Sequence, residues 1–92
     1  MPFIYYIYSK KQLYAEAYNN RGALKNDLGD KQEAVKDYNK AIELNPNDVD
    51  AYNNRGILKY EIGNQSGACE DWSKAGELGE MRAYELIKEY CK

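Results

Sequence analysis

The hydrophobic pattern of this chain has the spacing of helices. Small and apolar residues recur every three or four positions between residues 15 and 44, as expected for one face of each of two successive helices. Gly29 separates the two faces, since glycine readily takes the left-handed conformation in which helices end. Asp30 with Glu33 has the capping-box pattern of a helix start, and Asn45-Pro46 ends the second helix. The predicted helices are 15–28 and 31–44.

The same pattern occurs twice. When residues 15–48 are laid over residues 49–82, fifteen of the 34 positions are identical without a gap. A repeat of this length is one helical hairpin, which buries its apolar side only by stacking on a neighbour. The second copy therefore predicts two further helices, over 49–62 and 65–78.

A fifth helix is expected at the C-terminal end, over residues 80–91. Its apolar residues fall at i, i+3, i+4 and i+7, and the residues between them are charged. Such a helix would close the last apolar face of a stacked repeat. The apolar positions are Ala83, Leu86, Ile87 and Tyr90.

Within each 34-residue unit, aromatic, glycine, alanine and proline residues fall at fixed places. These are Tyr18, Gly22, Ala34, Tyr38, Ala41 and Pro46, then Tyr52, Gly56, Ala68, Trp72 and Ala75. The pattern resembles the tetratricopeptide repeat (TPR) family. The resemblance implies an all-α superhelix of two hairpin repeats, 15–48 and 49–82, with a C-terminal capping helix. Two departures stand at matched places: the family's leucine is Arg21 and Arg55, and its mid-helix tyrosine is Lys25 and Lys59.

The resemblance also implies a concave groove lined by the first helix of each repeat, where amide side chains can hydrogen-bond an extended peptide. The residues it places there are Asn19, Asn20, Ala23 and Asn26 in the first repeat and Asn53, Asn54, Ile57 and Tyr60 in the second. An equally weighted alternative is that the asparagines tie neighbouring repeats together. Some repeats of the family bind a terminal carboxylate, but of the five matching places only Asn54 fits outright.

Each unit also pairs an arginine with an acid sixteen residues later: Arg21 with Asp37, and Arg55 with Asp71. The acid falls on the face of the second helix that should oppose the first. We expect a structural ion pair within each hairpin, with ligand binding by the arginines as the alternative.

The N-terminal segment, residues 1–14, is rich in tyrosine and isoleucine. Its spacing predicts a short helix near 3–12 that covers the open side of helix 15–28, in its own chain or across a homodimer. The competing interpretation is a strand or disorder, because Phe3 to Tyr8 consists largely of strand-forming residues.

Composition narrows the function. The chain has no histidine, and its 13 basic and 15 acidic residues are well mixed, which disfavours catalysis, metal or cofactor binding and nucleic acid partners. No apolar stretch reaches the length of a membrane helix. The two cysteines, Cys69 and Cys91, are expected to be reduced rather than joined in a disulfide, which is the less favoured alternative. Cys69 is expected to be a small core residue, in a cytoplasmic setting.

The sequence therefore predicts a non-catalytic module that binds a protein or peptide through its concave face. Two alternatives remain open. One is a structural unit that forms a homodimer through residues 1–14, and the other is a regulatory cap within a larger complex.

Overall fold

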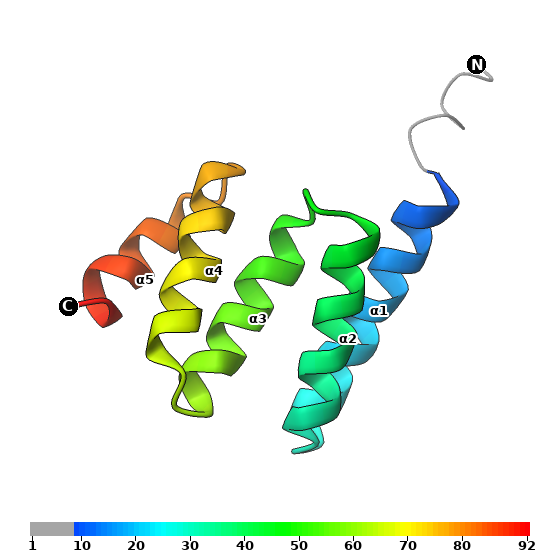
Figure 1. Cartoon of the computed structure of the whole chain (residues 1–92), viewed down its shortest axis with the longest axis horizontal. Coiled ribbons are helices and arrows are strands. Elements are labelled where there is room, and N and C mark those ends of the chain that lie inside the picture. The colour runs from blue at the N-terminus through cyan, green and yellow to red at the C-terminus, as the bar shows by residue number, and fades with distance from the viewer. Residues whose placement is uncertain (1–8) are drawn as a thin grey trace.

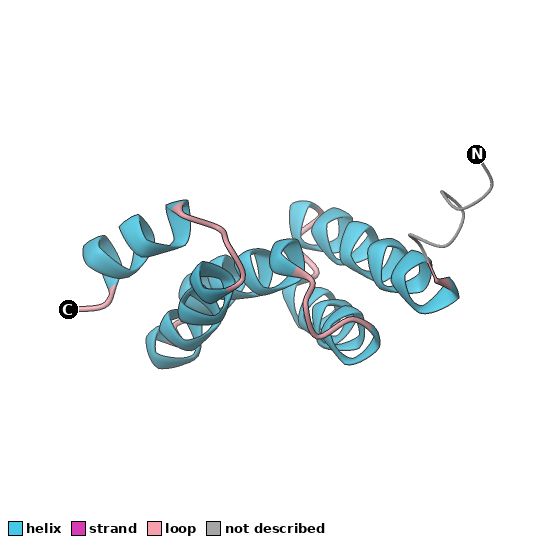
Figure 2. Ribbon diagram, turned by 90° about the horizontal axis from the view of Figure 1, so that it is seen from above, coloured by secondary structure: helices cyan, strands magenta, loops and turns pink. Residues whose placement is uncertain are grey.

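Five helices joined by short turns make up the chain in the computed structural model, which describes residues 9–92 (Figure 1). No strand occurs among these residues, so the all-α prediction is confirmed. Seen from above, α1, α3 and α5 lie in one layer and α2 and α4 in the other (Figure 2). The helices are α1 (Lys10–Asp27), α2 (Lys31–Leu44), α3 (Val49–Glu61), α4 (Gln65–Glu77) and α5 (Arg82–Tyr90).

The first helix begins five residues earlier than expected. Ser9 is extended and caps it: its hydroxyl accepts from the Gln12 N–H at 3.2 Å, and its own N–H donates to the Gln12 side chain at 2.7 Å. This reciprocal pair is a capping box, and its sequence sign is Ser9 with Gln12 three residues later. The prediction of a separate helix over 3–12 is thus wrong for Lys10 to Gln12, which form the first turn of α1. The rest of that predicted helix, residues 3–8, lies outside the described residues.

Glycine ends three of the helices. Gly29, Gly63 and Gly79 have φ angles of 87°, 93° and 111°, values that favour glycine. The N–H of the residue that follows each glycine donates a hydrogen bond to the carbonyl five residues earlier, which completes a Schellman motif. The expected capping box at Asp30 is not formed, because its side chain makes no cap hydrogen bond. Glu33 turns instead to Lys36 and Lys25.

The two helices of each hairpin approach closely where a glycine faces an aromatic ring. A Cβ on Gly22 would lie 2.8 Å from the Tyr38 ring, and one on Gly56 would lie 2.7 Å from the Trp72 ring. Both rings are almost completely buried, so neither has room to move aside. The remaining space is filled by small residues, with Ala34 and Ala68 fully buried beside the rings. Glycine and alanine thus set the short distance between helices.

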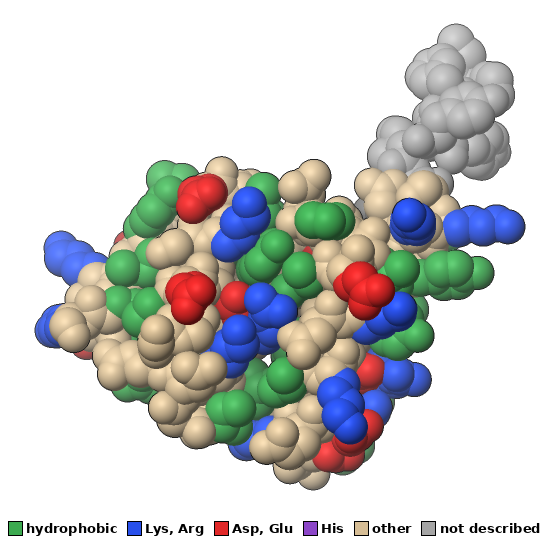
Figure 3. Space-filling view, viewed as in Figure 1, with side chains coloured by type: hydrophobic (Ala, Val, Ile, Leu, Met, Phe, Trp, Pro, Cys, Tyr) green, Lys and Arg blue, Asp and Glu red, His purple; other side chains and the backbone are tan. Residues whose placement is uncertain are grey.

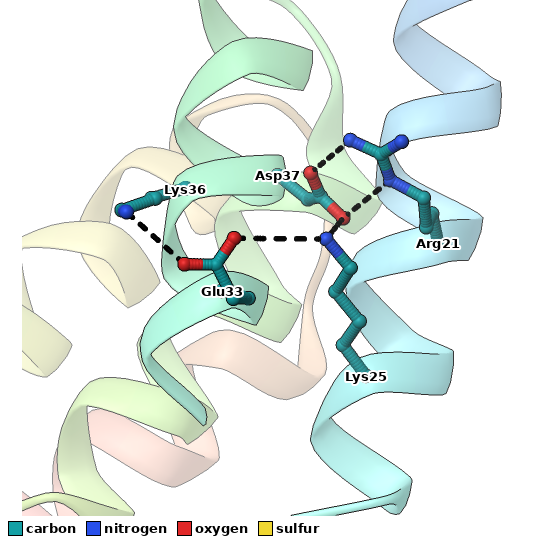
Figure 4. Close-up of polar contacts among 5 residues, drawn as sticks. All are labelled: Arg21, Lys25, Glu33, Lys36 and Asp37. Carbon is teal, nitrogen blue, oxygen red and sulfur yellow. Dashed lines mark hydrogen bonds and ion pairs between the residues drawn. The ribbon is translucent and has the colours of Figure 1, made fainter. Parts of the chain in front are cut away.

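A buried aspartate joins the two helices of each hairpin. Arg21 donates two hydrogen bonds to Asp37 at 2.8 and 2.9 Å, and the Lys25 ammonium lies 3.3 Å from the same carboxylate (Figure 4). In the second hairpin, Arg55 donates to Asp71 at 2.7 and 2.8 Å. Lys59 lies 3.3 Å from it. The unexpected arginine and lysine of each repeat therefore act together on one carboxylate.

Hydrogen bonding and charge both favour the ionised form of the Asp37 carboxylate. The Arg21 guanidinium, which hydrogen-bonds to Asp37, holds the pKa of that carboxyl below its usual value near 3.8, against the opposing effect of burial. The aspartate side chains are each 5% exposed, whereas Arg21 is 56% and Arg55 17% exposed. The second pair is therefore the more deeply desolvated.

The layer of α2 and α4 carries charges of both signs. Lysine and arginine side chains alternate with acidic ones across this face, and apolar side chains lie between them (Figure 3). Such a surface has no extended field of one sign for a polyanion to follow. Among the described helices, none is both long and apolar enough to span a membrane.

The cysteines are not free, which corrects the expectation that they are reduced. Cys69 on α4 and Cys91, directly after α5, form a disulfide with their Cα atoms 6.0 Å apart. Helix α5 runs along α4 and buries Ala83 against it, which brings the two thiols together. The sequence offered no sign of this pairing, because it depends on how α5 packs. The expected cytoplasmic setting had rested on reduced cysteines and loses that support.

The first prediction concerns the buried aspartates. We expect Asp71→Asn to lower the free energy of unfolding by about 2–4 kcal/mol and Asp37→Asn by about 1–2 kcal/mol. The difference arises because Arg55 is left largely buried without its carboxylate, whereas Arg21 reaches water. Urea denaturation measures both, with the exposed Asp27→Asn as the control. Equal losses in all three variants would contradict a structural role for the pairs.

The pH dependence has a defined sign. Since the folded-state pKa of Asp37 is lowered, its stabilising contribution is complete above the usual aspartate value and is lost as the pH falls through the lowered one. The stability of Asp37→Asn should therefore fall less steeply than that of the wild type below about pH 4.

A second prediction concerns the disulfide. Replacing both cysteines by serine should lower the free energy of unfolding by about 3 kcal/mol, because the unfolded chain is no longer closed across 22 residues. Urea denaturation followed by the fluorescence of Trp72, the only tryptophan, measures this loss. The wild type in reducing agent should behave like the double variant. An unchanged midpoint on reduction would show that the bond adds no stability.

Candidate functional site

Two of the candidate asparagines bond to each other. The Asn54 side-chain amide donates to Asn19 Oδ1 at 3.1 Å, which joins α3 to α1 across the repeat boundary. Asn19 is buried and Asn54 half-buried. This contact is the tie between repeats that the sequence left as an alternative to ligand binding.

Asn26 also takes part in a contact between repeats. Its Oδ1 accepts from the Lys31 ammonium at 2.8 Å, and the same ammonium lies 3.2 Å from the Glu61 carboxylate at the end of α3. The link crosses from the first hairpin to the second. Ala23 is half-buried on α1 and lines neither the hollow between α1 and α3 nor the one between α3 and α5.

Asn53 differs from its counterpart in the first repeat. Asn19 and Asn53 are 34 residues apart, so the donor matching Asn54 would stand at position 88, where the chain has Lys88, an exposed residue. Asn53 Oδ1 is buried and has no hydrogen-bond partner among the described residues. The series of amide ties therefore ends with an unused acceptor between α3 and α5.

Asn53 lines a groove between α3 and α5 with a volume of about 490 Å³. Its floor is apolar and its rim charged. Seven residues line it: Asn53, Ile57, Arg82, Glu85, Leu86, Glu89 and Tyr90. The groove continues over Tyr60 and the edge of Trp72. We call these two connected hollows the α3–α5 groove.

Three aromatic rings support one end of the α3–α5 groove. The ring centroids of Tyr60 and Tyr90 are 4.8 Å apart, and each lies 6.0 Å from the centroid of Trp72. Their tilted contacts are of the kind that stabilises aromatic clusters. Tyr60 is 41% and Ile57 38% exposed, so a sizeable apolar area stays open to water.

A second hollow, of about 380 Å³, lies where the first half of α1 meets the start of α3. Its lining is made of amides and acids: Gln12, Glu16, Asn19, Asn20, Asn45, Asp48 and Asp50. Burial raises the pKa of Asp48, whose carboxylate caps α3 by accepting from the Ala51 N–H. With almost no apolar surface, this hollow offers little to a hydrophobic partner.

The structure thus divides the eight candidate residues. Asn53, Ile57 and Tyr60 come together in the α3–α5 groove, and Asn19 and Asn20 lie at the second hollow, between α1 and α3. Asn54 and Asn26 make contacts between repeats, and Ala23 lies outside both hollows. The groove residues on α5 were missed as ligand contacts, because that helix was interpreted only as a cap.

The 34-residue frame did contain a signal for one of them. Extending it once more places Tyr90 where Gly22 and Gly56 stand. A tyrosine at that place fills the space into which a following helix would otherwise pack its ring. Tyr90 instead contacts Tyr60 and Trp72 across the groove.

Comparison with known proteins agrees with the repeat seen in the sequence. Residues 15–48 and residues 37–70 each match the tetratricopeptide repeat family, the second match beginning in α2 and ending in α4. No curated protein matches the sequence. Repeats of this family generally serve as non-catalytic protein–protein interaction modules.

Among solved structures, the crystal structure of MamA protein is similar, with 31% sequence identity and a TM-score of 0.78. The similarity covers 85% of this chain and 43% of the MamA chain, so this chain spans less than half the length of that structure. Fold, repeat length and family matches agree, and the chain belongs to the tetratricopeptide repeat family.

Proposed function

We propose that this chain is a non-catalytic protein-interaction module that binds a peptide or partner surface in the α3–α5 groove. The observation that carries the proposal is the exposed apolar floor of the groove beside a buried acceptor, Asn53 Oδ1, that has no partner among residues 9–92. Apolar contacts would supply most of the binding free energy. The Asn53 side chain, which lines the groove, would fix the direction of a bound main chain by hydrogen bonding to it.

The surroundings of the groove support this assignment. One wall, α3, is fixed to α1 by the Asn54–Asn19 bond, and the other wall, α5, is fixed to α4 by the disulfide. A groove with walls held in place loses little conformational entropy when it binds.

The inventory of side chains supports a non-catalytic role. The chain has no histidine, and the most buried acids, Asp37 and Asp71, are fully engaged with arginine and lysine inside the hairpins. Neither aspartate lines the groove, so neither is placed to act on a bound molecule.

The third prediction tests the groove. Ile57→Ser should weaken binding of a partner by about tenfold, because it removes apolar area from the floor. Ile62→Ser is the matched control, since Ile62 is 43% exposed at the end of α3 and lies outside the groove. Proteins that the wild type retains from the native host are then measured by calorimetry against both variants. Equal affinities of the two variants would place the site elsewhere.

A second candidate function, self-association, is favoured by α1. Leu13, Leu24 and Leu28 are 54%, 58% and 75% exposed and fall within one stripe of the helix. Exposed apolar stripes of this kind mark contact surfaces. The homodimer expected through residues 1–14 would use this face, although residues 1–8 lie outside the described part of the chain.

The fourth prediction concerns this stripe. If copies associate through α1, Leu24→Lys with Leu28→Lys should convert a dimer to a monomer, because buried lysines would lack partners at the interface. Light scattering across a concentration series measures the mass. A wild type that is monomeric throughout, or a dimer that survives both substitutions, would exclude association through this face.

A further inference from the structure

The rim of the α3–α5 groove has an excess of negative charge. Three carboxylates and one guanidinium border the groove: Glu61, Glu85, Glu89 and Arg82. Arg82 is paired with Glu80 at 3.4 Å and Glu61 with Lys31 at 3.2 Å. Glu85 and Glu89 have no ion-pair partner among residues 9–92, so the groove keeps two uncompensated negative charges.

These two glutamates stand four residues apart on α5 and repel each other across one helical turn. Both are exposed, so water screens them in the free protein. A cationic side chain placed between them would relieve the repulsion. Beside them, Leu86 and Ile57 would contact an apolar side chain of the same ligand.

We propose that the α3–α5 groove selects an extended segment in which apolar residues alternate with lysine or arginine. In an extended chain, successive side chains point to opposite sides, so one set meets the apolar floor and the other meets Glu85 and Glu89. The Asn53 side chain, which lines the groove, hydrogen-bonds the main chain of the segment, as Asn54 bonds to Asn19 in the first repeat. This inference rests on the proposed function and specifies its ligand.

The charge of the groove excludes the opposite ligand. An acidic segment, or a chain end that presents its carboxylate, would be repelled by Glu85 and Glu89. Arg82 would not offset this repulsion, because it is already paired with Glu80. Like charges facing each other across an interface are unfavourable and give discrimination between partners. The affinity for the basic segment should accordingly fall as salt is added.

The test uses three labelled synthetic peptides of about eight residues, long enough in extended form to cross the groove. One alternates leucine with lysine, one leucine with glutamate, and one serine with lysine. Fluorescence anisotropy with the full oxidised chain gives each Kd. The leucine–lysine peptide should bind about tenfold or more tightly than either of the others, since only it satisfies both floor and rim.

Two double charge reversals locate the effect. Glu85→Lys with Glu89→Lys should raise the Kd of the leucine–lysine peptide by about tenfold and lower that of the leucine–glutamate peptide. Glu70→Lys with Glu77→Lys makes the same change in net charge at exposed positions of α4 outside the groove. This control should change either Kd by less than about threefold.

The outcomes separate the ligand from the site. Equal affinity for the leucine–lysine and leucine–glutamate peptides overturns the charge selection, and so does an equal effect of both reversals, which would indicate net charge alone. If these peptides bind alike but are both lost from Ile57→Ser, the groove stands and its ligand class is wrong. Binding of the leucine–lysine peptide that survives Ile57→Ser overturns both the ligand and the proposed function.

Discussion

Each hairpin of this fold depends on a carboxylate that its second helix buries against its first. Asp37 and Asp71 lie in the contact between two helices, where an unpaired charge would be strongly unfavourable. An arginine and a lysine one turn apart on the first helix both reach that charge. The two helices are therefore fixed in axial register as well as in distance. The same three positions in each repeat, one aspartate with its arginine and lysine partners, set the geometry on which stacking relies.

Close packing completes this geometry. The rings of Tyr38 and Trp72 lie over glycines, so the two helices of each hairpin pack closely. The first helices of successive repeats lie in one layer. Because α1, α3 and α5 form that layer, whatever lies between consecutive first helices decides where a ligand can enter. Between α1 and α3 the Asn54–Asn19 bond joins the helices. Between α3 and α5 no such bond forms, and the space is an open groove.

The groove thus arises where the repeat stops being regular. Lys88 stands where the next amide donor would be, and Tyr90 where the next glycine would be. The first change leaves Asn53 Oδ1 without a donor, and the second adds a ring to the groove wall. The disulfide then holds α5 in place although the helix has only nine residues. Departures from the repeat, rather than the repeat itself, give this module its candidate site.

Apart from the start of α1, the sequence by itself determined the five helices, the hairpin repeat and the aspartate partners of the two arginines. These features follow from patterns along the chain: the helical spacing of apolar residues, the identity between the two 34-residue units, and the sixteen-residue offset between arginine and aspartate. Helix and hairpin geometry convert each pattern into structure. Tertiary structure alone decided which asparagines are used between repeats, that Cys69 meets Cys91, and that α5 is a groove wall. Each of these depends on the distance between side chains on helices far apart in the chain. Such distances follow from how α5 packs on α4 and α3 on α1. They cannot be derived from the spacing of residues along a single helix.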